Sequence, residues 1–120
     1  MNMTNKPLST ATTLLPRYQE LLPIIRRIAH ANGYAIGLHG SGQRDLDLIA
    51  VPWTAEAVPA EELIERLVEA CEGENRAGVL EPDVANRPHG RRAWVILLSG
   101  SKLFYEHLYI DLSVMPLKPE

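Results

Sequence analysis

Apolar residues recur at helical spacing in two stretches of the chain, residues 14–29 and residues 59–73. In the first stretch, Pro16 suits an opening turn, but Pro23 falls inside the pattern. An interior proline costs about 3 kcal/mol in a helix, so this stretch predicts one bent helix or two short ones. The second stretch, PAEELIERLVEACEG, opens with proline and two glutamates and ends in glycine. It predicts a regular amphipathic helix.

Four other segments have the short apolar or alternating pattern of strands. They are residues 34–39, 46–52, 92–98 and 107–114, and a weaker strand is expected within residues 77–82. The resulting order is helix, two strands, helix, weak strand, two strands. We therefore expect an α+β fold, a small mixed sheet with helices packed on one face. Residues 1–13 are expected to be a flexible lead-in, and residues 14–120 a single domain.

Composition narrows the class of protein. The 120 residues suffice for one domain, and a net charge of −3 gives no basic excess for a broad nucleic-acid surface. Cys71 is the one cysteine, so no internal disulfide forms, and its place on an apolar helical stripe predicts a core residue. No apolar run is long enough to cross a bilayer, and the N-terminus lacks a signal-peptide pattern. We expect a soluble cytoplasmic protein without a membrane partner.

Acidic residues stand at the start of one predicted strand, in the segment HGSGQRDLDLIAVPW (residues 39–53). Asp45 and Asp47 share one strand face, because alternate side chains point the same way. Asp111 has the same relation to the apolar residues of the last strand. If these two strands are neighbours, their apolar sides face one core, and the three aspartates cluster on the opposite face.

Three clustered carboxylates repel one another, and they either acquire raised pKa values or require a cation. Oxygen ligands suit Mg²⁺ or Mn²⁺, and two such ions can serve phosphoryl transfer. Gly40 permits backbone N–H groups to approach an anion, and Arg44 offers positive charge. The simpler alternative is a solvated strand end, with Ser41 as a turn former and Arg44 paired with an aspartate.

Two further segments supply candidate contacts. His89, Arg91 and Arg92 cluster in RPHGRRAW, next to a strand start. They form either a loop that contacts an anion above the acidic face or a loop of solvated charges. His39 could face the same site, although a hydrogen-bonded structural histidine is the simpler interpretation.

Gly-Ser, an Asp-x-Asp before an apolar strand and a later strand with one more Asp resemble the nucleotidyltransferase superfamily with the polymerase-β-like fold. Segments 40–50, 88–94 and 109–116 also resemble small phage-encoded members. The resemblance implies a catalytic metal triad of Asp45, Asp47 and Asp111, and triphosphate contact near Gly40 and Ser41. The chain departs from the pattern between Ser41 and Asp45, where the superfamily usually has a longer segment with a short helix.

Three hypotheses follow. The first is a minimal nucleotidyltransferase-like domain that binds Mg²⁺ or Mn²⁺ and a nucleoside triphosphate, with phosphate contacts from Gly40, Ser41, Arg44, His89 and Arg91. The second is a noncatalytic nucleotide- or protein-binding module that retains the fold, which the short segment before Asp45 motivates. The third is an unrelated α+β domain with exposed acids, for which Asp111 would lie far from Asp47.

Overall fold

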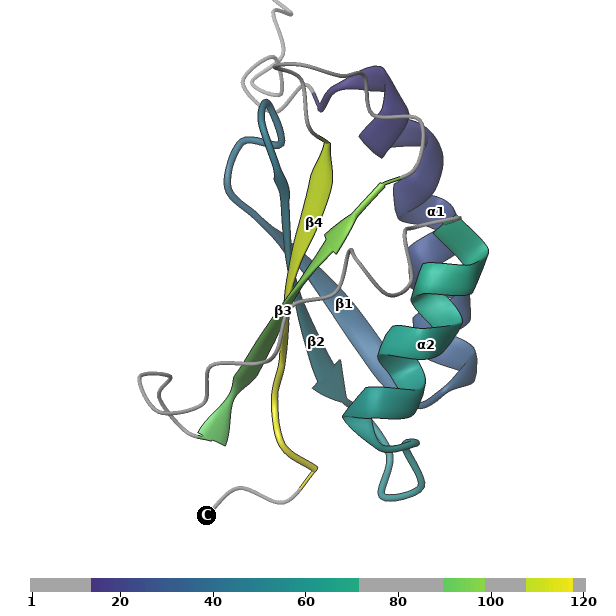
Figure 1. Cartoon of the computed structure of the whole chain (residues 1–120). Helices are drawn as coiled ribbons and strands as arrows, with labels where there is room; N and C mark the ends of the chain where they lie inside the picture. The colour runs from purple at the N-terminus through teal and green to yellow at the C-terminus, as the bar shows by residue number, and fades with distance from the viewer. Residues whose placement is uncertain (1–13, 72–89, 99–107, 118–120) are drawn as a thin grey trace, which may run out of the picture.

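The computed structural model describes residues 14–71, 90–98 and 108–117, which contain two helices and four strands (Figure 1). The expected lead-in at residues 1–13, the expected weak strand at 77–82 and His89 lie outside these residues. The elements are, in chain order, α1 (Pro16–Ala31), β1 (Tyr34–His39), β2 (Leu46–Pro52), α2 (Ala60–Cys71), β3 (Arg92–Leu97) and β4 (Tyr109–Val114).

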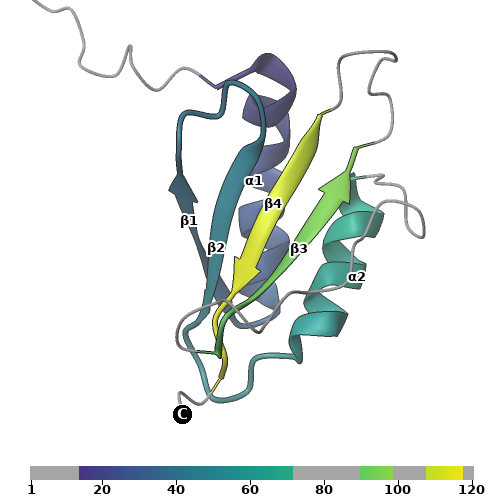
Figure 2. The same ribbon diagram turned by 60° about the vertical axis from the view of Figure 1, so that its left-hand side comes forward.

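The strands form one mixed sheet in the order β1-β2-β4-β3 (Figure 2). Strands β1 and β2 are an antiparallel hairpin, and β3 and β4 also pair antiparallel. The central pair, β2 and β4, is parallel. The strand that carries Asp111, β4, is therefore the direct neighbour of β2, which carries Asp47. A cluster of the predicted aspartates requires this adjacency.

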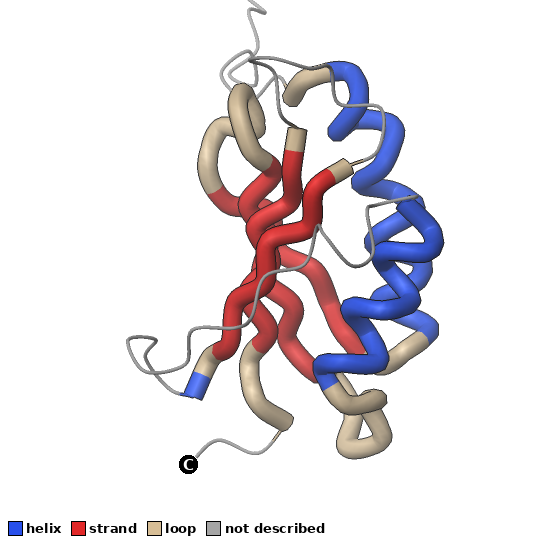
Figure 3. The backbone as a smooth tube through the Cα atoms, in the orientation of Figure 1, coloured by secondary structure: helices blue, strands red, loops and turns tan. Residues whose placement is uncertain are grey.

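Both helices cover the same face of the sheet (Figures 1 and 3). Helix α1 buries a stripe that includes Tyr18, Leu21 and Ile25, and α2 buries Leu63 and Leu67. The alternating apolar residues of the strands complete this core, and Cys71 belongs to it as predicted. The α+β architecture with helices on one side is thus confirmed. Neither described helix has the length and apolar character that a membrane span needs.

Helix α1 runs without interruption from Pro16 to Ala31, so of the two alternatives the structure has a single helix. Pro23 lies within it on the exposed side, while Ile25 behind it is buried. Burial of the apolar stripe outweighs the missing N–H of the proline, because each buried aliphatic side chain contributes about 1.5–3 kcal/mol.

Candidate metal centre

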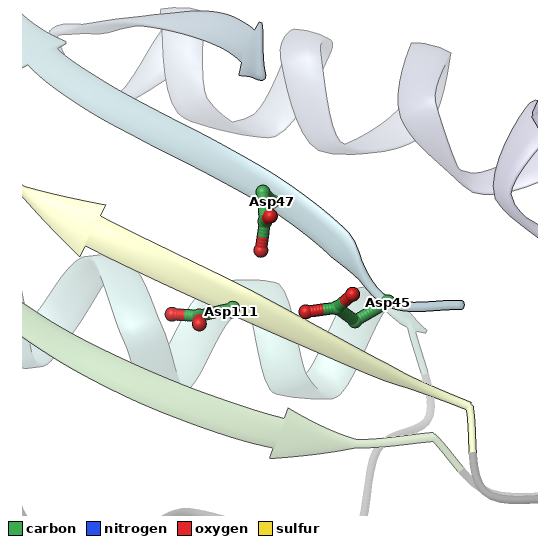
Figure 4. A group of neighbouring side chains, drawn as sticks. All are labelled: Asp45, Asp47 and Asp111. Carbon is green, nitrogen blue, oxygen red and sulfur yellow. The ribbon is translucent and has the colours of Figure 1, made fainter. Parts of the chain in front are cut away.

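The three predicted acids lie together at the N-terminal end of the two central strands, β2 and β4. Asp47 is directly opposite Asp111 in the parallel register of β2 and β4, and Asp45 immediately precedes β2. One carboxylate oxygen from each residue lies within 4.8 Å of the other two. The side chains project from the face that the helices leave free (Figure 4). Sequence alternation together with the adjacency of β2 and β4 thus produces the cluster, and Asp111 does not lie far from Asp47, which is the placement that would have favoured the third hypothesis.

Repulsion within the cluster acts on the pKa of Asp47. Partial burial raises the pKa of Asp47, and the charge of Asp45, a side-chain hydrogen bond to Asp45 and the charge of Asp111 raise it further. His39 acts in the opposite direction, since it is the cross-strand partner of Asp47 in β1. The fold therefore holds like charges together at some cost, and a cation would remove that cost.

The loop between β1 and β2 passes close to Asp47. Gly40 has φ +79°, and a Cβ atom at this position would lie 3.0 Å from Asp47 Oδ2. Ser41 is exposed, and its hydroxyl accepts a hydrogen bond from the Gln43 backbone N–H at 3.2 Å, which is the geometry of a turn former. Arg44 is also exposed, and within the described residues it makes no ion pair with Asp45 or Asp47. The predicted phosphate contacts of this loop remain predictions.

Helix α1 fixes this loop in place. The Leu15 N–H donates to the Gly42 carbonyl at 3.1 Å, and the Tyr18 hydroxyl donates to the Arg44 carbonyl at 2.6 Å. The same hydroxyl accepts a hydrogen bond from the Tyr109 N–H at 3.3 Å. Tyr18 thus connects the residue before Asp45 to the start of the strand that carries Asp111. The helical periodicity of the sequence indicates only that Tyr18 is a core residue. A buried tyrosine hydroxyl usually has a hydrogen-bond partner, so the sequence predicts a partner without identifying it.

A cavity of about 250 Å³ opens over the acidic face. Its polar lining consists of His39, Asp47, Arg91, Asp111 and Ser113. His39 and Arg91 therefore lie on the same face as the aspartates, and the anion contact expected of Arg91 stays a prediction.

The donor set suits a hard divalent cation, because all three predicted ligands are carboxylates. Oxygen ligands of one octahedral Mg²⁺ lie about 3–4 Å apart, given metal–oxygen distances of about 2.1 Å. Small side-chain rotations would bring the oxygens of Asp45, Asp47 and Asp111 from their present spacing into that range. The face is accessible through the cavity, so a ligand could complete the coordination.

No protein-family model and no curated protein matches the chain. Among solved structures, the chain is similar to one of a cytoplasmic RNA terminal U-transferase, with 13% sequence identity and a TM-score of 0.40. The similarity covers 89% of this chain and 33% of that one, so the chain spans about a third of the length of the transferase.

Proposed function

We propose that the chain is a minimal nucleotidyltransferase-like domain that binds Mg²⁺ or Mn²⁺ on Asp45, Asp47 and Asp111. The observation that supports it most directly is the register of β2 and β4, which sets Asp47 beside Asp111 and leaves Asp45 within reach of both. A nucleoside triphosphate is the proposed ligand, because divalent ions held by few carboxylates usually also bind phosphate oxygens.

In this proposal the carboxylates have distinct roles. Asp45 and Asp47 hold the cation, which would supply charge stabilisation for a transferring phosphoryl group. Asp111 completes the ligand set and accepts the proton of an acceptor hydroxyl. The backbone at Gly40, together with Ser41 and Arg44, contacts the phosphates from the loop that borders Asp47.

Calorimetric titration of the full chain with Mn²⁺, and then with ATP in the presence of Mn²⁺, tests the proposal. We expect saturable binding that weakens at least about 100-fold in Asp47→Asn, since loss of groups that merely orient a ligand already costs about 10–100-fold. Glu65→Gln is the matched control, because it removes the same charge from an exposed position on α2. Wild-type protein that binds no cation would refute the proposal.

One observation favours a second candidate, a noncatalytic nucleotide- or protein-binding module. The segment between Ser41 and Asp45 contains no helix, and its Gly42 is packed against Leu14 and bonded to Leu15. This loop therefore has little room to surround a triphosphate. Nucleotide turnover that Asp45→Asn abolishes would exclude this alternative, whereas Mn²⁺-dependent binding without turnover would support it.

A further inference from the structure

Arg91 lines the cavity above the acids, and in the described part of the chain one of its guanidinium nitrogens has no hydrogen-bond partner. The Nε atom is buried and makes no hydrogen bond in the described part of the chain. No ion pair between Arg91 and Asp47 or Asp111 is present there either, although all three line the cavity. A buried donor without a partner is unfavourable, and an anionic ligand would satisfy it.

The neighbouring arginine shows what a satisfied guanidinium looks like in the same segment. Arg92 points to the other side of β3, where its Nη1 lies 2.7 Å from Glu61 Oε2. Its guanidinium also lies 5.0 Å from the centroid of the Trp94 ring. Two consecutive arginines therefore have opposite surroundings, and the charge of Arg91 alone is directed to the cavity.

Ser113 provides a hydroxyl at the same end of the cavity. It is buried, with 7% of its surface exposed, and it follows Asp111 on the same face of β4. Its cross-strand neighbour in β3 is the small Ala93. Because residues two apart on a strand are separated by about 7 Å, this hydroxyl lies beyond the three carboxylates rather than among them.

We propose that Arg91 and Ser113 bind a phosphate group of the acceptor substrate, so that the acceptor is a phosphorylated molecule. The inference rests on the proposed metal-dependent transfer and extends it. The loop from Gly40 to Arg44 borders the cluster at Asp47, whereas Ser113 lies two residues beyond Asp111 along β4 and Arg91 precedes the β3 residues that pair with this end of β4. The two anion-binding elements thus flank the carboxylates, which places the nucleotide phosphates on one side and the acceptor phosphate on the other.

Charge also couples the two sites. Without a cation, Asp47 and Asp111 repel any anion in the cavity, and a bound divalent ion reverses that effect. Phosphate therefore binds more tightly to metal-loaded protein, and by reciprocity the metal binds more tightly in the presence of phosphate.

The test is an NMR titration of the full, Mg²⁺-loaded chain with inorganic phosphate as the probe, following arginine Nε–H and backbone amide signals. We expect saturable shifts at Arg91 and Ser113 and a loss of phosphate affinity of about 10–100-fold in Arg91→Gln. Arg92→Gln is the matched control, since it removes the same charge one residue away on the other face, and its affinity stays within about twofold. Ser113→Ala, a minimal change, weakens binding about threefold to tenfold.

Two outcomes overturn the inference: unchanged phosphate affinity in Arg91→Gln, or saturable shifts at Arg44 in place of Arg91. A separate Mg²⁺ titration without phosphate distinguishes this result from failure of the proposed function. Metal binding without phosphate binding refutes the Arg91 site alone. If wild-type protein binds no metal, the phosphate titration is made on Asp47→Asn, where one repelling charge is absent; a saturable Arg91 shift then supports the site, and its absence refutes it.

Discussion

At the scale of single residues, Asp47 is the residue whose ionisation is opposed by its surroundings in the candidate site. It is partly withdrawn from water and lies close to both Asp45 and Asp111, and these effects raise its pKa. A carboxyl whose pKa is higher in the folded than in the unfolded chain binds protons more strongly when folded. Its ionisation therefore destabilises the fold at neutral pH, and this cost is relieved as the pH falls through the folded pKa.

Replacement of Asp47 should accordingly stabilise the metal-free protein. We expect Asp47→Asn to raise the melting temperature at pH 7 by about 1–5 °C, because removal of about 0.2–1 kcal/mol of repulsion shifts the transition by that amount. The gain should shrink as the pH is lowered through the pKa of Asp47, where the wild-type carboxyl also becomes neutral. Thermal unfolding of both proteins between pH 7 and pH 4 measures this, with Glu65→Gln as control. A lower melting temperature for Asp47→Asn at pH 7 would contradict the account.

Tyr18 is the second residue with a measurable role, as the residue that positions the site. Burial raises its pKa to about 12, with smaller contributions from Asp45 and Asp47, so the hydroxyl keeps its proton and remains a donor. Through that hydroxyl it connects the Arg44 carbonyl with the Tyr109 N–H.

Tyr18→Phe should therefore weaken Mn²⁺ binding about threefold to tenfold, in addition to a stability loss of about 1 kcal/mol from the missing hydrogen bonds. Tyr34→Phe is the matched control: its hydroxyl donates to the Val58 carbonyl at 2.7 Å, at the end of the hairpin away from Asp47. The control should lose similar stability while its Mn²⁺ affinity stays within about twofold. Equal losses of metal affinity in both variants would show that Tyr18 acts only through stability.

The sequence could predict the three aspartates of the site but not the contacts of Tyr18 or the burial of Arg91. Asp45, Asp47 and Asp111 follow from alternation within two strands, which is local information. The partners of Tyr18 lie 26 and 91 positions away in the chain, so no local pattern contains them. The buried state of the Arg91 Nε atom likewise depends on tertiary packing.

At the scale of elements, helix α1 retains a proline where a better helix former would fit. Pro23 is exposed, so no packing interaction explains it. The strong hydrophobic stripe is what keeps the helix continuous.

Pro23→Ala should increase the free energy of unfolding by about 1–3 kcal/mol, because it restores a backbone donor and removes a steric conflict. Some of the gain is offset by the greater freedom of the unfolded chain. Pro16→Ala is the control in the same helix: Pro16 occupies the first turn, where no N–H partner is lost, and no gain is expected. Urea unfolding measures both, and equal effects would contradict the explanation.

The sequence predicted the elements more fully than their arrangement. The strands predicted at residues 34–39 and 46–52 have the bounds of β1 and β2. The two strands are close in the sequence, and they pair as a hairpin. The sequence did not predict the order of the strands in the sheet, because an apolar face does not specify which strands are neighbours. That β2 and β4 are adjacent was therefore an assumption. The parallel pairing of Asp47 with Asp111 depends on α2 and β3 crossing between them, which is a property of the whole chain.

At the scale of the whole molecule, the fold is a two-layer structure with its chemistry on the uncovered side of the sheet. The helices bury one face completely enough that Leu46 and Leu112 have no exposed surface. The same strands present Asp47 and Asp111 to the other side. One set of strand residues thus forms the core, and the alternate set supplies the candidate site.

The parallel pairing at the centre of the sheet also has a kinetic consequence. The carboxylates come together only when β2 pairs with β4, which are far apart in the sequence. The unfolded chain and the early stages of folding therefore have no site for a cation. Saturating Mn²⁺, at about 100 times its dissociation constant, should slow unfolding about 100-fold and leave refolding nearly unchanged. Stopped-flow measurements of tryptophan fluorescence, to which Trp53 and Trp94 contribute, would give the unfolding and refolding rates separately. The ion would then stabilise only the folded domain. Accelerated refolding would instead mean that the three acids come together before the transition state of folding.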